Sequence, residues 1–153
     1  MSGIRFYKMT GSGNDFVCVD GREYPVESWS VEAIRSACDR RTGVGGDGLV
    51  VVTPEGPEAI RMVYFNADGS RAGMCGNAAL CSTRLAARLG LAPAAGMVLY
   101  TDTGLLSTRC VGPGWSASWP VPSGELSSTT RTSRRGSWTR IWGMIRGRFW
   151  LSL

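Results

Sequence analysis

Short apolar runs separated by turn sequences make up most of the first 111 residues. The runs are rich in valine, isoleucine and leucine, a composition typical of strands. The turns are rich in Gly, Asn and Asp: TGSGND at 10–15, NADGS at 66–70 and TDTG at 101–104. We therefore expect strands over residues 4–9, 16–20, 49–53, 60–65, 97–101 and 105–111.

Two segments carry the apolar spacing of a helix instead. After Ser30, a good N-cap, an apolar stripe recurs at Val31, Ile34 and Cys38. This helix should end by Gly43. The second helix should start at Asn77 as N-cap and close at Gly90, with its apolar stripe at Cys81, Leu85 and Leu89. The order strands, helix, strands, helix, strands favours an α+β domain over a doubly wound sheet.

Charge and tryptophan content change abruptly near residue 112. Residues 1–112 carry 11 basic and 11 acidic residues, whereas residues 113–153 carry six arginines and only Glu125. Five of the six tryptophans also lie in this last segment. We therefore expect one domain over residues 1–112, followed by a Trp/Arg/Ser-rich tail over 113–153 that is not a folded domain.

The tail allows three interpretations. Arginine on phosphate and tryptophan on bases would suit nucleic acid. A basic aromatic segment can also lie on a membrane surface, but RIWGMIRGRFWLSL at 140–153 has two glycines and lacks a clean polar face. The third interpretation, which we favour, is a shifted reading frame, because GC-rich DNA read out of frame gives Trp, Arg, Gly and Ser.

Residue types exclude several classes of chemistry. The chain has no histidine, so a Ser-His-Asp or Cys-His arrangement is impossible. Five cysteines without a CxxC pair offer neither a zinc site nor a disulfide scaffold. Proton transfer near neutral pH would need a shifted carboxylate, the single lysine Lys8, or a cysteine. No stretch is apolar over the ~20 residues that cross a bilayer, and the N-terminus lacks signal-peptide features, so we expect a cytoplasmic location.

One cysteine stands apart from the other four. Cys18, Cys38 and Cys81 fall on apolar faces and are expected in the core, and Cys110 lies in a predicted strand. Cys75 comes just before the second helix, where free N–H groups and the helix dipole favour a thiolate. It is either a reactive thiol or simply a residue at a helix start.

The glycines of GVGGDG satisfy G-x-G-x-x-G at Gly43, Gly45 and Gly48. A dinucleotide fingerprint should follow a strand and open a helix. Here the motif follows a helix and leads into a strand, so a tight glycine-rich turn is the better interpretation.

Four blocks resemble the diaminopimelate epimerase family in order and spacing: KMTGSGNDF at 8–16, GVGGDG at 43–48, FNADGS at 65–70 and MCGNA at 74–78. Related racemases acting on proline typically have histidine after the Cys-Gly, where this chain has Asn77. The resemblance implies an α+β fold with a curved, mostly antiparallel sheet wrapped around a central helix, one of the two domains of the family. It also implies no pyridoxal phosphate, no metal and, often, a homodimer.

The implied activity is epimerisation of LL-diaminopimelate to meso-diaminopimelate, in lysine and peptidoglycan precursor synthesis, by proton transfer between two cysteines. By matching motif, Cys75 is the catalytic cysteine of this domain. Gly76 and Asn77 resemble the carboxylate-binding turn, and Asn14 and Asn66 match the asparagines that hold the distal end of the substrate. Two positions depart from the family: Gly48, where some members have glutamine, and Leu80, where arginine is usual.

The resemblance ends near residue 112, before the second domain and its cysteine. We therefore expect a truncated, inactive copy of the enzyme whose partner is the small molecule diaminopimelate, with no membrane partner. The alternative is a non-catalytic fragment whose basic Trp/Arg tail binds nucleic acid or a partner, of which nucleic acid is not favoured.

Overall fold

The computed structural model of this chain describes residues 3–111, 116–118 and 145–149. Within these ranges nine strands join in one sheet with two α-helices and one 3-10 turn. The strands are β1 (Ile4–Gly11), β2 (Asn14–Asp20), β3 (Gly48–Pro54), β4 (Ala59–Asn66), β5 (Arg71–Ala72), β6 (Met97–Thr101), β7 (Gly104–Val111), β8 (Ser116–Ser118) and β9 (Ile145–Phe149). The helical elements are η1 (Val26–Ser28), α1 (Val31–Cys38) and α2 (Gly76–Leu89).

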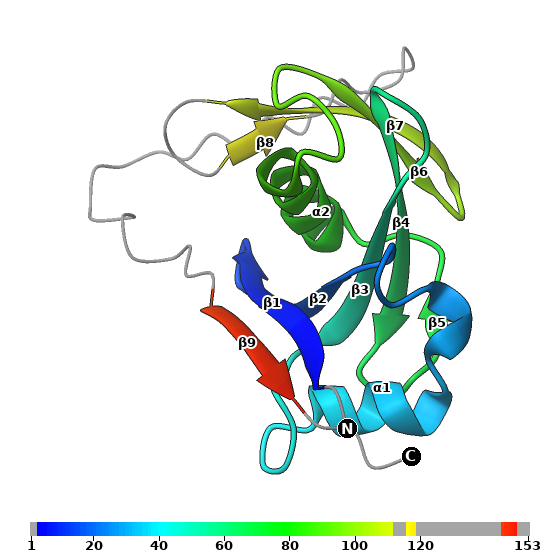
Figure 1. Cartoon of the computed structure of the whole chain (residues 1–153), viewed down its shortest axis with the longest axis vertical. Helices are drawn as coiled ribbons and strands as arrows, with labels where there is room; N and C mark the ends of the chain where they lie inside the picture. The colour runs from blue at the N-terminus through cyan, green and yellow to red at the C-terminus, as the bar shows by residue number, and fades with distance from the viewer. Residues whose placement is uncertain (1–2, 112–115, 119–144, 150–153) are drawn as a thin grey trace.

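The sheet is mostly antiparallel and curls around α2 (Figure 1). Its order is β8-β7-β6-β4-β3-β2-β1-β9, with β5 added on β4. The parallel pairs are β2–β3 and β4–β6, and each is joined by a crossover that contains a helix. The two crossovers step the same way across the sheet while their strands run in opposite directions. Right-handed crossovers then place α1 and α2 on opposite faces. The expected α+β fold, a curved sheet around a central helix, is confirmed.

The two helices create a core on each face of the sheet. One core lies between the sheet and α2 and includes Cys18, Val50 and Leu85. The other packs α1 and Trp29 against residues such as Val17. Because β2 and β3 are covered on both faces, their buried stretches are continuous rather than alternating.

The hairpin between β1 and β2 closes tightly. Gly11 pairs with Asn14, so the loop contains only Ser12 and Gly13. Both loop residues have positive φ, 48° and 97°, which is the pattern of a type I′ turn. This turn fixes Asn14 at the first position of β2.

The first helix begins as the sequence predicts. Ser30 is its N-cap, and the Ser30 hydroxyl accepts a hydrogen bond from the Ala33 N–H at 3.2 Å. Ile34 and Cys38 are buried, but Val31 is 47% exposed. The prediction that Val31 belongs to the buried stripe is wrong, because the covered face of α1 is made by Ala33, Ile34, Ala37 and Cys38.

The second helix begins two residues earlier than its expected cap. Cys75, not Asn77, is the N-cap, and Asn77 lies in the first turn. Because the helix starts earlier than expected, Asn77 is already inside it and is not the cap, and its side-chain amide donates to Asn14 Oδ1 at 2.6 Å. At the other end Gly90 closes the helix as predicted, with φ of 67°.

The tail contributes two strands at the two ends of the sheet. β8 pairs antiparallel with β7, and β9 pairs antiparallel with β1. The five tail tryptophans, 115, 119, 138, 142 and 150, lie outside the described residues. The prediction that residues 113–153 do not form a folded domain therefore stays a prediction.

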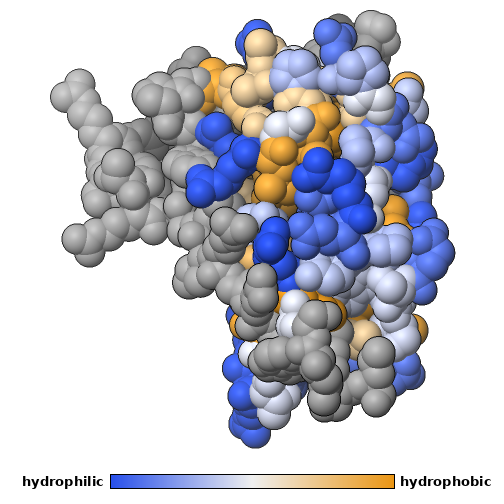
Figure 2. Space-filling model, viewed as in Figure 1, coloured by the Kyte–Doolittle hydropathy of each residue, from blue (hydrophilic) through white to orange (hydrophobic). Residues whose placement is uncertain are grey.

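Apolar residues also reach the surface. Figure 2 shows them gathered over α2, with hydrophilic residues covering most of the remaining coloured surface. Neither α-helix of the described ranges has the length and apolar composition that crossing a bilayer requires.

Candidate functional site

The asparagines singled out by the sequence gather at one end of the sheet. β2 and β3 are parallel and β4 is antiparallel, so β2 and β3 begin where β4 ends. Gly48, the first residue of β3, pairs with Phe16 on one side and Asn66 on the other. The start of α2 reaches the same end, because Asn77 is hydrogen-bonded to Asn14.

Cys75 lies at the N-terminus of α2 with its side chain partly exposed. The Cys75 carbonyl accepts the first helical hydrogen bond, from the Ala79 N–H at 2.9 Å. Among the described residues its thiol makes no capping hydrogen bond. The N–H groups of Gly76 and Asn77 have no acceptor within the helix, and they lie at its N-terminus, the positive end of the helix dipole. A thiol and two amide donors therefore share one helix terminus.

Three of the other cysteines are in a different environment. Burial raises the pKa of Cys18 well above its ordinary value. Burial also raises the pKa of Cys38 to about 11, and that of Cys81 to about 12 with a smaller contribution from neighbouring Cys75. These thiols stay protonated at neutral pH, as expected for core residues.

Cys110 is partly exposed but lies away from the site. Its N–H donates to the Ala94 carbonyl, in the segment that follows the C-terminus of α2. A helix of 14 residues is about 21 Å long, so Cys75 and Cys110 are near opposite ends of α2.

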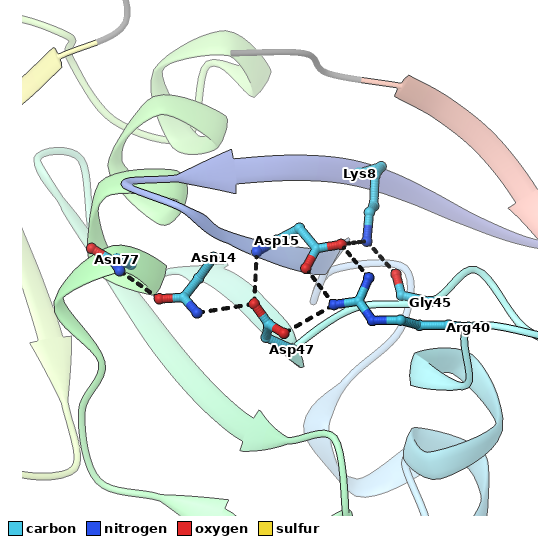
Figure 3. A network of polar contacts seen from close by, with 7 residues as sticks. All are labelled: Lys8, Asn14, Asp15, Arg40, Gly45, Asp47 and Asn77. Carbon is cyan, nitrogen blue, oxygen red and sulfur yellow. Dashed lines mark hydrogen bonds and ion pairs between the residues drawn. The ribbon is translucent and has the colours of Figure 1, made fainter. Parts of the chain in front are cut away.

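A chain of hydrogen bonds leads from the start of α2 to the glycine-rich turn (Figure 3). Asn77 Nδ2 donates to Asn14 Oδ1 at 2.6 Å, and Asn14 Nδ2 donates to Asp47 Oδ2 at 2.9 Å. The Asp15 N–H also donates to Asp47 Oδ2, at 3.1 Å. Arg40 Nη2 donates to the other Asp47 oxygen at 2.9 Å. Both oxygens of Asp47 are thus held.

A second carboxylate completes this network. Asp15 accepts two hydrogen bonds from the Arg40 guanidinium, at 2.9 and 2.7 Å, and one from Lys8 Nζ at 2.7 Å. Lys8 also donates to the Gly45 carbonyl. The hydrogen bond from Arg40, together with Lys8, holds the pKa of Asp15 well below its usual range despite partial burial. Lys8 is therefore engaged in an ion pair with Asp15.

Sequence reasoning missed the charged part of this network. Asp15 and Asp47 do stand inside the GSGND and GVGGDG blocks, so block membership was the available signal. Arg40 carries no such signal, because it precedes the glycine-rich turn and reaches Asp15 across 25 residues of sequence.

The structure does not connect Asn66 to the other candidate residues. Its Nδ2 donates to Ser70 Oγ at 3.0 Å, and its backbone N–H donates to the Ser70 carbonyl at 2.8 Å. Asn66 thus closes the NADGS turn at the same end of the sheet. Its assignment to the distal end of the substrate stays a prediction.

The glycine-rich turn is tightly packed. Gly45 has φ of 79°, and a Cβ on Gly43 would collide with the Ser36 carbonyl oxygen. A Cβ on Gly48 would meet the carbonyl oxygen of Phe65 and the ring of Tyr64. Close packing and backbone conformation therefore explain why glycine occupies these positions, which agrees with the interpretation of the motif as a tight turn. Leu80 lies partly buried on α2, and nothing in the structure explains its departure from arginine.

Within the described part of the chain, no three His, Cys, Asp or Glu side chains are grouped as metal ligands would be. Asp15 and Asp47 are already paired with Arg40 and Lys8. The expectation that the reaction needs neither metal nor cofactor stays a prediction.

The fold defines the class: α+β domains in which a curled sheet surrounds a central helix. Solved structures with this fold include a methylitaconate-delta-isomerase, with a TM-score of 0.56 and 19% identity over 70% of this chain and 34% of that one. They also include a phenazine biosynthesis protein of the PhzF family from Bacillus anthracis, with a TM-score of 0.53 and 24% identity over 71% of this chain and 36% of that one.

The chain belongs to the diaminopimelate epimerase family, whose sequence model matches residues 6–114. A diaminopimelate epimerase of Gemmatimonas aurantiaca is 45% identical over 138 residues. That match covers 86% of this chain, a span longer than residues 1–112, so similarity to this relative continues into the tail. It covers 50% of the relative, so the chain spans about half the length of this curated protein.

Proposed function

We propose that this chain forms one half of a diaminopimelate epimerase active site, with Cys75 as the proton-transfer group of that half. The observation that carries the proposal is the position of Cys75, which is partly exposed at the N-cap of α2. Family membership supports the reaction class, and the contact between Asn77 and Asn14 supports a substrate site at this helix terminus.

The chemistry requires two groups on opposite faces of the α-carbon. The Cys75 thiolate takes the α-proton, the bonding pair stays on carbon as a planar carbanion, and a second thiol returns a proton to the other face. Inversion follows, with no net loss of atoms. The N–H groups of Gly76 and Asn77 would bind the carboxylate and stabilise the charge that builds on it. Asn14 and Asn66 are proposed to contact the distal end of the substrate.

The second group is proposed to come from the half of the enzyme that this chain does not match. If Cys75 is the single thiol at this helix terminus, as it is among the described residues, the opposite face of the α-carbon would lack an acid. Oriented binding accounts for roughly 7–11 kcal/mol of a barrier in well-positioned reactions. We therefore propose that the 153-residue chain by itself is inactive as an epimerase.

The test is solvent-deuterium incorporation at the α-carbon of diaminopimelate, which also detects proton exchange without inversion. The 153-residue chain should give negligible incorporation. A fusion that carries a family C-terminal domain after residue 112 should epimerise, and Cys75→Ala in that fusion should abolish activity. The matched control is Cys110→Ala, which removes a partly exposed thiol near the other end of α2 and should leave activity unchanged. Full activity of the Cys75→Ala fusion, or robust epimerisation by the 153-residue chain, would contradict the proposal.

The alternative function is a non-catalytic fragment whose basic tail binds nucleic acid or a partner. It rests on the composition of residues 113–153, most of which lie outside the described residues. The coding DNA discriminates between the two. A shifted frame after codon 112 that encodes the family's second cysteine motif would favour the enzyme fragment, whereas stop codons in every shifted frame would favour the binding module.

A further inference from the structure

We propose that Asp47 is a positioning residue: acting through Asn14, it fixes which end of the Asn77 amide faces a ligand at the start of α2. The inference deepens the proposed function and rests on it for the identity of the ligand. It starts from the hydrogen-bonding capacity of the three side chains in Figure 3.

The first step concerns Asp47 itself. A carboxylate accepts hydrogen bonds and donates none. Its Oδ1 is held by Arg40, and its Oδ2 accepts from the Asp15 N–H. The backbone is fixed as well, since the Asp47 N–H donates to the Asp15 carbonyl at 2.7 Å and the Asp47 carbonyl accepts from Ala67. Asp47 is therefore an immobile acceptor.

The second step concerns the orientation of the two asparagine amides. Because Asp47 only accepts, Asn14 must turn its NH₂ group toward Asp47, at 2.9 Å. The oxygen of Asn14 then faces Asn77, which must donate its own NH₂ group, at 2.6 Å. Reversing either amide would place two oxygens or two NH₂ groups in contact, so one carboxylate determines the orientation of both side chains.

The third step is the consequence for a ligand. Within the described residues, Asn77 Oδ1 accepts no hydrogen bond, and it is not among the buried atoms. Asn77 therefore offers an acceptor oxygen two residues from Cys75, beside the N–H donors of the helix terminus. A ligand group that donates a hydrogen bond would be accepted there, and one that only accepts would be disfavoured.

The experiment is NMR of the full 153-residue chain with the Asn side-chain NH₂ signals assigned. In the unmodified protein, a through-hydrogen-bond coupling should join the Asn14 Nδ2 nitrogen to the Asp47 carboxyl carbon. Asp47→Asn keeps the size of the side chain but can present NH₂ or oxygen. It should speed solvent exchange of the Asn77 NH₂ group roughly tenfold, the factor expected for losing one side-chain hydrogen bond.

Two controls separate positioning from general loosening. Asp68→Asn alters another turn aspartate, which binds Ser70, and should leave the Asn77 NH₂ signal unchanged. In an Asn14→Ala background, Asp47→Asn should have no further effect on Asn77, because the effect passes through Asn14. Backbone signals of β6 report whether each variant is folded.

An equal effect of Asp47→Asn with and without Asn14 would overturn the inference, as would unchanged Asn77 exchange in a folded Asp47→Asn variant. Absence of the coupling in the unmodified protein would do so without any variant. None of these measurements needs substrate or turnover, so they succeed or fail independently of the deuterium assay.

Discussion

At the scale of single residues, exposure separates Cys75 from the three core cysteines. Cys18, Cys38 and Cys81 are buried with raised pKa values, whereas Cys75 is partly exposed at a helix N-terminus. We expect iodoacetamide at mildly acidic pH to label Cys75 well before those three, since only the thiolate reacts. Peptide mass spectrometry over time measures the order.

The denatured chain is the control for this labelling experiment, because unfolding removes burial and should bring the cysteines to similar rates. Simultaneous labelling of Cys75 and the core cysteines in folded protein would contradict the assignment of Cys75 as the reactive thiol.

Single residues also show which parts of the candidate site could be predicted from the sequence. The sequence placed Cys75 at the start of the helix, because the change from a turn to an apolar helical stripe can be recognised from the order of the residues alone. The pairing of Asn77 with Asn14 was not visible, since 63 residues separate them and either could have capped a helix or turn locally. Local preference predicted Asn77 as the N-cap, but the helix begins earlier and the Asn77 side chain contacts Asn14.

At the scale of elements, the N-cap of α1 allows a test of how much one local sequence signal stabilises a helix. The Ser30 hydroxyl accepts from the Ala33 N–H, so Ser30→Ala leaves a donor of the first turn without its partner. The free energy of unfolding should fall by about 1 kcal/mol, within the usual range for a lost N-cap. Urea unfolding followed by circular dichroism measures it.

Ser36→Ala is the matched control, an exposed position inside the same helix. Alanine has the higher helix propensity, so this change should be neutral or slightly stabilising. Equal losses for Ser30→Ala and Ser36→Ala would show that the cap is not the cause.

Elements were predicted well where the pattern was local. The six expected strands and both helices are present, with strand ends shifted by a few residues. The short strand β5 was missed because two residues carry no periodicity, and it exists only through pairing with β4. The exposure of Val31 was missed because its spacing fits the apolar stripe, whereas the buried face of α1 is made by Ala33, Ile34, Ala37 and Cys38.

At the scale of the whole molecule, the carboxylates of the described residues predict acid sensitivity. The pKa values of Asp15 and Asp20 lie below the ordinary value in the folded chain, so the unfolded chain binds more protons near pH 4. Their contribution to stability is fully present above about pH 5 and is lost as pH falls toward the folded pKa values. Urea unfolding at a series of pH values between about 6 and 2 should show a declining free energy of unfolding.

Asp15→Asn should flatten this decline. The Arg40 side chain is 59% exposed, so solvent screening limits the ion pair with Asp15 to about 1 kcal/mol or less. Glu58→Gln is the control, an exposed acid that makes no ion pair within the described residues. An identical pH profile for unmodified protein and Asp15→Asn would remove Asp15 from the explanation.

The arrangement of the sheet was predictable only in outline. Alternating elements indicated α+β, and the family resemblance supplied the curved sheet around a central helix. The pairing of β2 with β3 and of β4 with β6 joins strands that are distant in sequence, and no local pattern encodes which strands become neighbours.

The pairing of β1 with β9 has a consequence for how the chain is made. Ile4 lies opposite Phe149, so β1 leaves the ribosome long before the strand that pairs with its outer edge has been synthesised. At about 5–20 residues per second, this interval is roughly 7–30 s. Throughout it, the outer edge of β1 presents unpaired N–H and C=O groups to other nascent chains. Translation speed and chaperone binding to β1 therefore influence how much of this protein reaches this fold.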